Sequence, residues 1–187
     1  MKRINSIVIL GVVLHTLAGC ARTVVENPQN TNYAPADINA QLDFWHNLDE
    51  RSAITNDEAM HAILIFAEGA DPTASYEERV ENLKQRGWLH LSFDESADLA
   101  VQRGTLARML AFAIDAPQGV LSTVFNRTPR YALRDLMAID IMPAGSDLQA
   151  IDGREFLGVF GKAQDYRAIR DARRRAAENS DQPADAG

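Results

Sequence analysis

Apolar residues recur at intervals of three or four positions along most of this 187-residue chain, which is the spacing of one face of an α-helix. No stretch shows the sustained alternation of apolar and polar residues that is typical of a half-buried β-strand. Signals that start a helix, in which a short polar side chain caps the first turn, precede several of these stretches, at Thr55, Ser75, Thr128 and Asp152. The sequence therefore predicts an all-α, mostly helical domain.

Three of the predicted helices follow one template, in which an aliphatic residue precedes a polar cap and the apolar face begins five residues later. The aliphatic residues are Ile54, Val101 and Ile151, so the template recurs after 47 and then 50 residues. A second helix type, seen over residues 80–89, recurs 53 residues later over residues 133–142. Two helix types in one repeating unit predict stacked helical hairpins that share a core.

The stretch Arg86-Gly87-Trp88-Leu89, followed by Val101-Gln-Arg103-Gly-Thr, resembles the S-layer homology module, and weaker echoes begin at Ile54 and Ile139. The resemblance covers residues 54–163 and implies a helical repeat that binds cell-wall polysaccharide, with Arg103 and Trp88 as the ligand-binding pair. No unit keeps all four residues of the family's Thr-Arg-Ala-Glu-like helix start. Two alternatives stay open: a module that binds the wall, and the same scaffold without that activity.

The first twenty residues have the layout of a secretion signal. Lys2 and Arg3 form a basic start, residues 7–14 form an apolar core, and Leu17-Ala18-Gly19-Cys20 follows. The apolar core is too short to cross a bilayer of roughly 30 Å. The four residues ending at Cys20 closely resemble the lipobox of bacterial lipoproteins. An ordinary secretory signal that happens to contain a cysteine is the less favoured alternative.

The lipobox resemblance implies that residues 1–19 are removed and that acyl chains on Cys20 hold the protein in a membrane of the cell envelope. In that family an Asp after the cysteine often retains the protein at the inner membrane, and Ala21 stands there instead. In an organism with two membranes, we therefore expect attachment to the outer membrane, facing the periplasm.

Charge and cysteine content exclude two other possibilities. The formal net charge is −7, and loss of the signal's Lys2 and Arg3 would lower it to −9. A chain this acidic is a poor candidate for binding nucleic acid. Cys20 is the single cysteine, so there can be no intramolecular disulfide and stability must come from a packed core.

Composition suggests three parts after the signal. Residues 20–38 are rich in Asn and Pro and are predicted to form a flexible, lipidated tether. Residues 39–166 form the predicted helical domain, and residues 167–187 a charged, disordered tail. Within that tail, residues 173–175 are three arginines, which could contact phosphate or an acidic partner. A solvated helix end is the favoured interpretation.

No catalytic or cofactor motif stands out. After the signal, His46, His61 and His90 stand alone, so no metal site or cofactor is expected. There is no phosphate-binding loop, dinucleotide fingerprint or Gly-x-Ser-x-Gly motif. The densest polar cluster combines Asp94 and Glu95 with Asp98 and His90. It could hold a cation or act as a carboxylate pair, but a solvated loop is favoured.

Three functions follow, in order of preference. The first is a non-catalytic, lipid-anchored envelope protein whose domain binds peptidoglycan or wall polysaccharide. The second is an adaptor that docks another envelope protein through an apolar groove. The third is a wall-modifying enzyme that uses the acidic cluster around Asp94.

Overall fold

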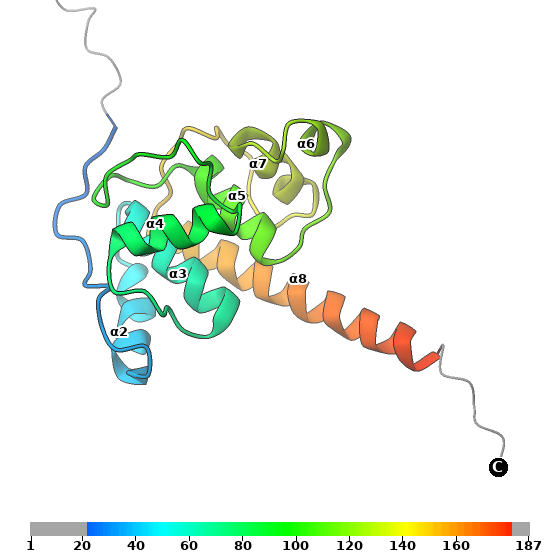
Figure 1. The fold of residues 1–187 in the computed structure, drawn as a ribbon, viewed down its shortest axis with the longest axis horizontal. Helices are drawn as coiled ribbons and strands as arrows, with labels where there is room; N and C mark the ends of the chain where they lie inside the picture. The colour runs from blue at the N-terminus through cyan, green and yellow to red at the C-terminus, as the bar shows by residue number, and fades with distance from the viewer. Residues whose placement is uncertain (1–21, 181–187) are drawn as a thin grey trace, which may run out of the picture.

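The computed structural model describes residues 22–180 and confirms the predicted all-α fold (Figure 1). Strand-like pairing between residues 22 and 180 is limited to three isolated β-bridges. The lipobox with Cys20 lies outside the described residues, so its acylation stays a prediction. The helices of the described range are α2 (Ile38–Leu48), α3 (Asn56–Glu68), α4 (Tyr76–Gln85), α5 (Arg103–Ala113), α6 (Val120–Val124), α7 (Pro129–Ala138) and α8 (Gly153–Ser180).

The predicted caps start several of these helices. Thr55 Oγ1 accepts a hydrogen bond from the Glu58 amide at 3.0 Å, and the Glu58 carboxylate accepts one from the Thr55 amide at 2.8 Å. This reciprocal pair is the capping box expected for α3. Ser75 Oγ caps α4 by accepting from the Glu78 amide at 3.3 Å, but the Glu78 carboxylate accepts from the Ala74 amide, so the reciprocal half of the box is not formed. Thr128 stands at the start of α7 without a side-chain cap, so Pro129 at the first helical position supplies the start signal.

The three positions of the repeating template meet in the middle of the domain. The Ile54 amide donates to the Ile151 carbonyl at 3.0 Å, and the Val101 amide donates to the Ile54 carbonyl at 2.8 Å. All three side chains are completely buried. Around this centre, α3 packs against α4, α5 against α7, and α8 against α2. The repeat itself stays a prediction, because the three helix pairs differ in chain order. α4 follows α3 and α7 follows α5, whereas α2 precedes α8.

The core forms where the predicted apolar faces meet. The predicted faces of α3, α5 and α8 supply most of it, and Leu48 and Leu136 add to it from α2 and α7. Trp45 is half-buried and meets the ring of Phe160 edge-on, with ring centroids 5.5 Å apart. The predicted role of Trp45 as an anchor in the core fits this position. Burying one large apolar side chain contributes roughly 1.5–3 kcal/mol to folding.

The prediction of a flexible tether over residues 20–38 is wrong for residues 22–37, which we call the N-terminal strap. The strap lies along the domain: the Ala100 amide donates to the Thr23 carbonyl at 2.8 Å, and the Val25 amide donates to the Asp98 carbonyl at 2.9 Å. A polar, Pro-containing segment can be ordered when groups of the folded domain satisfy its backbone. Here those partners come from residues far away in the sequence.

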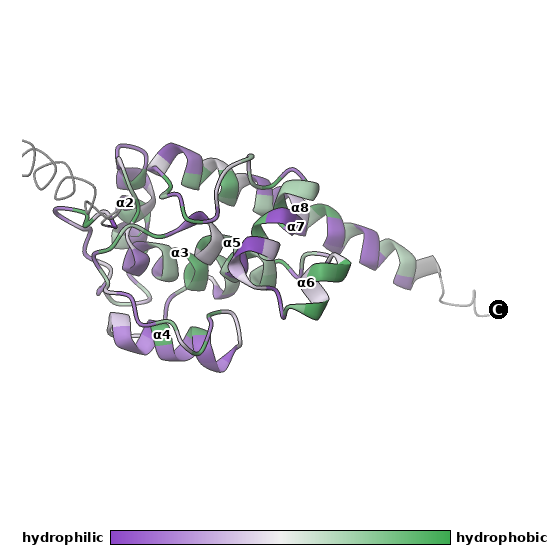
Figure 2. Cartoon of the chain, turned by 90° about the horizontal axis from the view of Figure 1, so that it is seen from above, coloured by the Kyte–Doolittle hydropathy of each residue, from purple (hydrophilic) through white to green (hydrophobic). Residues whose placement is uncertain are grey.

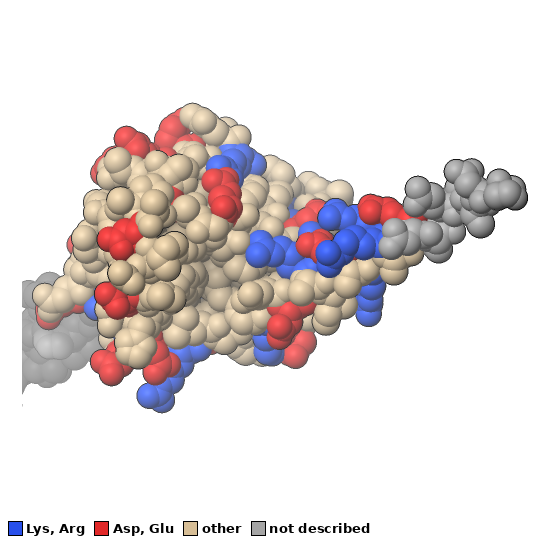
Figure 3. Space-filling model, turned by 90° about the horizontal axis from the view of Figure 1, so that it is seen from below, with Lys and Arg blue, Asp and Glu red and all other residues tan. Residues whose placement is uncertain are grey.

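Residues 167–180 of the predicted tail continue α8, and residues 173–175 are exposed on it, as the interpretation of a solvated helix end expects. Arg167 lies over the ring of Phe66 at 4.3 Å and donates to the Phe66 carbonyl at 2.9 Å, which holds this part of α8 on α3. Beyond this contact α8 projects from the domain (Figure 1), and basic side chains gather on the projecting part (Figure 3). Arg174 forms ion pairs one turn away with Asp171 and Glu178, which support an exposed helix. Between residues 22 and 180 no helix is both long and apolar enough to cross a bilayer.

Candidate binding site

The structure places the first predicted ligand-binding residue, Arg103, inside the domain. Its side chain is 3% exposed and forms an ion pair with Glu155 at the start of α8. It also donates a hydrogen bond to the Pro143 carbonyl at 2.7 Å. A Cβ at Gly145 would lie 3.0 Å from Arg103 Cζ, so the turn packs closely against the guanidinium. Arg103 therefore ties α5 to α8 and to the turn before it.

The second predicted residue, Trp88, lies elsewhere. It follows α4, is half-buried against the core, and carries the guanidinium of Arg86 over its ring at 5.3 Å. In the described part of the chain no contact joins Trp88 to Arg103. The structure does not bring the predicted pair together in one site.

The predicted acidic cluster is also divided. Glu95 forms an ion pair with Arg22 and accepts a hydrogen bond from the side-chain amide Nδ2 of Asn56 at 3.1 Å. His90 instead hydrogen-bonds Ser92 at 2.7 Å, and it lines a different pocket from Asp94 and Glu95. Within residues 22–180 no three His, Cys, Asp or Glu side chains lie close enough together to hold a metal ion.

A basic pocket lies between the end of α4 and the side of α5, and we call it the Gly87 pocket. Its volume is about 440 Å³. Three of its lining residues, Lys84, Arg86 and Arg108, carry positive charge, and none is acidic. A pocket lined by three basic and no acidic residues is unusual in a chain with net charge −7. The lining consists of Lys84, Gln85, Arg86, Gly87, Leu89, His90, Leu91, Arg108, Phe112 and Asn126.

The rim of this pocket is set by the way α4 ends. Gly87 has φ +71°, a left-handed conformation that other residues rarely adopt. The Gly87 amide donates to the Lys84 carbonyl at 2.9 Å and the Trp88 amide to the Leu83 carbonyl at 2.9 Å. This is the Schellman pattern of helix ends. It turns the chain so that the Gly87 carbonyl accepts a hydrogen bond from Arg108 Nη2 at 2.8 Å.

Arg108 forms the floor of the pocket from α5 and is only 3% exposed. Its Nη1 donates to the carbonyls of Asn126 at 2.6 Å and Arg127 at 2.5 Å. Asn126 and Arg127 have φ of +49° and +48°, which is uncommon for residues other than glycine. The side chain of Arg108 thus holds a strained turn between α6 and α7 against the end of α4. Its Nε has no hydrogen-bond partner in the described structure.

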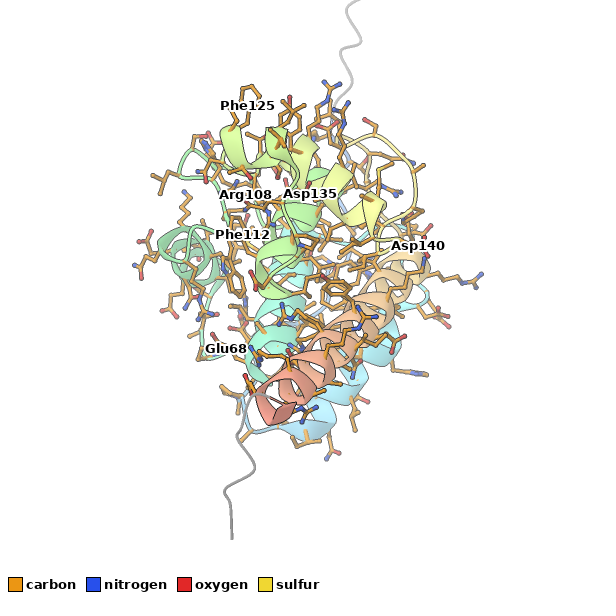
Figure 4. All side chains as sticks on the ribbon, turned by 90° about the vertical axis from the view of Figure 1, so that its right-hand side faces the viewer. Glu68, Arg108, Phe112, Phe125, Asp135 and Asp140 are labelled. Carbon is orange, nitrogen blue, oxygen red and sulfur yellow. The ribbon has the colours of Figure 1, made fainter. Side chains whose placement is uncertain are left out.

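A second buried arginine strengthens the positive charge behind the pocket. Phe112 lies between Arg108 and Arg127, whose Cζ atoms are 5.1 and 4.9 Å from its ring centroid. Arg108 and Phe112 both lie on the side of α5 that faces α4 (Figure 4). Burial lowers the pKa of Arg108, and the charge of Arg127 lowers it further. The two guanidiniums have one buried carboxylate near them, that of Asp135, 3.8 Å from Arg127 Nε.

This arrangement can bind an anion. Arginine keeps its proton in proteins, so the two buried guanidiniums leave positive charge that a single carboxylate only partly offsets. Lys84 adds an ammonium group that no hydrogen bond or ion pair engages in the described structure. Leu89, Leu91 and Phe112 add apolar surface beside the charges. Such a pocket fits an anionic group attached to a less polar body.

Arg108 was not among the residues predicted from the sequence, because it lies beside the apolar face of α5 on which that prediction rested. A signal was nevertheless present. Between Thr105 and Ala113 the helix contains no other charged residue, so its arginine cannot lie on a solvated polar face. An isolated arginine in an otherwise apolar helix indicates a buried cation with dedicated partners.

A second buried polar cluster fastens the strap and has a structural role. Tyr33 in the strap is hydrogen-bonded to His61 Nε2 at 2.7 Å, and His61 Nδ1 to Asp71 Oδ2 at 2.6 Å. Burial raises the pKa of Tyr33 to about 12, and the charge of Asp71 adds to the effect. The phenol therefore keeps its proton and does not act as a nucleophile at neutral pH. None of the pockets described above includes Tyr33.

Comparison of the chain with protein-family models, with curated protein sequences and with solved structures finds no match. The Gly87 pocket is therefore interpreted from its own residues.

Proposed function

We propose that this chain is a membrane-anchored envelope lipoprotein whose non-catalytic helical domain binds an anionic cell-wall polymer in the Gly87 pocket. One observation carries the proposal: the pocket combines Lys84, Arg86 and the buried Arg108 with no acidic side chain. Arg86 forms an ion pair with Glu68, which lies outside the pocket, so Lys84 and the buried Arg108 supply the uncompensated charge. In an acidic protein, such a basic concavity favours an anionic ligand.

The predicted location supports a wall polymer as that ligand. A protein held by Cys20 on the periplasmic face of a membrane would meet peptidoglycan, whose peptides carry carboxylates, and other anionic wall polysaccharides. An arginine guanidinium presents a planar set of donors that matches a carboxylate or phosphate. The apolar wall formed by Leu89 and Phe112 suits the less polar face of a sugar ring.

This proposal changes the residues that would contact the ligand. Arg103 is committed to Glu155 and the Pro143 carbonyl, so it supports the position of α5. Trp88 carries Arg86 on its ring and so helps to place a charge at the rim of the pocket. Lys84 and Arg86 take over the contacts that the S-layer homology resemblance assigned to Arg103 and Trp88. Arg108, whose Nη atoms are held by backbone carbonyls, adds positive charge from the floor of the pocket.

Co-sedimentation with purified sacculi tests the proposal. The full-length chain in mild detergent should sediment with intact sacculi at low salt, and soluble fragments from digested sacculi should compete for it. Binding should weaken as salt rises from about 0.05 M to about 0.5 M, because the Debye length shortens over that range. A chain that stays in the supernatant at low salt would contradict wall binding. Binding that resists both salt and the soluble fragments would contradict an ionic pocket.

A further inference from the structure

α6 carries an exposed apolar surface that nothing in the described structure covers. Val120, Leu121, Val124 and Phe125 are 81%, 51%, 70% and 49% exposed. Ser122, in contrast, is buried on the side of the short helix that faces the domain. Figure 2 shows α6 as a compact apolar segment at the surface, unlike the mostly hydrophilic α4. Four adjacent exposed apolar side chains mark an interaction surface and not scattered surface residues.

The surroundings of this apolar surface are basic. From Pro117 to Arg134 the chain contains three arginines and no acidic residue, although the whole chain has a net charge of −7. Arg130 and Arg134 are exposed on α7 beside α6. Arg134 lies over the ring of Tyr131, which stacks on Phe125 with ring centroids 5.2 Å apart. Apolar side chains flanked by exposed arginines are typical of segments that lie in the interface of an anionic membrane.

The position of α6 relative to the predicted lipid anchor at Cys20 also supports an anionic membrane as the partner of α6. In Figure 1 the described chain begins at the upper left and α6 lies at the upper right, so both are on the upper side of the domain but well apart along it. Figure 4, turned about the vertical axis, places Phe125 at the top. Cys20 is only two residues before Arg22 in the sequence. The ordered strap leaves no long tether that would hold the domain away from the bilayer.

We infer that α6 is a second membrane contact, in which Val120, Leu121, Val124 and Phe125 enter the interface of the phospholipid bilayer that holds Cys20. This inference rests on the lipid anchor of the proposed function. Once the acyl chains are inserted, α6 meets the bilayer at high effective concentration, so even a small apolar surface stays bound. The contact fixes the upper side of the domain on the membrane, and the projecting part of α8 points away from it (Figure 1).

Fluorescence quenching in vesicles tests the contact. Acylation consumes the Cys20 thiol, so Val124→Cys supplies one free thiol for an environment-sensitive fluorophore. Ala172→Cys, on the exposed projecting part of α8, is the matched control. The full-length acylated chain is reconstituted in vesicles of phosphatidylethanolamine and phosphatidylglycerol that contain a spin-labelled lipid. We expect about fivefold stronger quenching at position 124 than at position 172.

Three outcomes would overturn the inference, and they differ from one another. Equal, weak quenching at both positions on an acylated chain means that α6 does not touch the bilayer. Protection of position 124 from aqueous quenchers without lipid quenching, increasing with protein density, means that a second copy covers α6. Mass spectrometry that finds Cys20 without acyl groups removes the anchor, which also contradicts that part of the proposed function. Loss of sacculus binding, measured separately, contradicts the proposed function and leaves the α6 contact standing.

Discussion

Arg79 Nε donates a hydrogen bond to Asp71 Oδ2 across 2.5 Å, and this pair joins α4 to the loop between α3 and α4. Arg79 is completely buried and Asp71 is 4% exposed. The same guanidinium donates to Asp57 Oδ1 at 2.8 Å and to the Thr31 carbonyl at 2.9 Å. One arginine on α4 thus satisfies two carboxylates and the backbone of the strap.

Arg79→Met should destabilise the domain strongly. The substitution leaves the Asp71 carboxylate and the Thr31 carbonyl without their partner, and breaking a buried ion pair costs about 3–5 kcal/mol. The free energy of unfolding measured in urea should fall by about this amount. Arg154→Met is the control, because the Arg154 side chain is 82% exposed, and its effect should stay under about 0.5 kcal/mol. Equal effects of the two substitutions would contradict the role given to Arg79.

Acid should weaken the same cluster. Burial alone would raise the pKa of the Asp71 carboxyl, but hydrogen bonds from His61, Thr73 and Arg79 outweigh it and lower the pKa from 3.8 to about 2. A pKa lower in the folded than in the unfolded chain stabilises the fold above pH ~4, and this contribution is lost as pH falls toward 2. Its size is about 2 kcal/mol.

Asp71→Asn tests this dependence, whatever its effect at neutral pH. The free energy of unfolding of the wild-type chain should fall between pH 4 and pH 2 by about 2 kcal/mol more than that of Asp71→Asn. Asp43→Asn, at an exposed position on α2, should keep the wild-type slope. An unchanged slope in Asp71→Asn would show that other groups carry the acid sensitivity.

Gly153 is required where the start of α8 meets the end of α2. A Cβ at this position would lie 1.6 Å from the Leu48 carbonyl oxygen, and backbone cannot move aside as a flexible side chain can. Gly153→Ala should therefore lower the free energy of unfolding by more than about 3 kcal/mol or prevent folding. Gly158→Ala, in the same helix with open space around the new Cβ, should be neutral or add up to about 1 kcal/mol. Thermal and urea unfolding of both variants measures the difference.

Periodicity and caps made much of the helical architecture predictable. The apolar faces of α3, α5 and α8 are buried as expected, and the Thr55 capping box forms as its spacing predicts. Such signals are local, since helix faces and caps depend on residues three or four positions apart. The burial of Ile54, Val101 and Ile151 at one centre also agrees with their shared place in the template.

The failed predictions concern partners that are distant in the sequence. The strap is ordered by Arg79, which is 48 residues from Thr31, so composition alone gave no sign of this contact. The apolar face of α8 stops near Arg167, so the sequence gives no sign that Arg167 bonds the Phe66 carbonyl, 101 residues away. The Gly87 pocket was not predicted for the same reason. Arg108 forms its floor by donating to the carbonyl of Gly87, which lies 21 residues away, just after α4.

A charge reversal at Lys84, with sacculus binding as the readout, tests the central claim most directly. Lys84→Glu places an acidic group in the Gly87 pocket. In the described structure the Lys84 ammonium pairs with no other side chain, so its loss breaks no internal contact. Lys162→Glu makes the same change on α8, where the ammonium is half-exposed and pairs with Asp140 at 3.2 Å. At low salt we expect Lys84→Glu to weaken binding to intact sacculi by roughly tenfold, and Lys162→Glu to leave it unchanged. Equal binding by the two variants would contradict the Gly87 pocket as the site of wall binding.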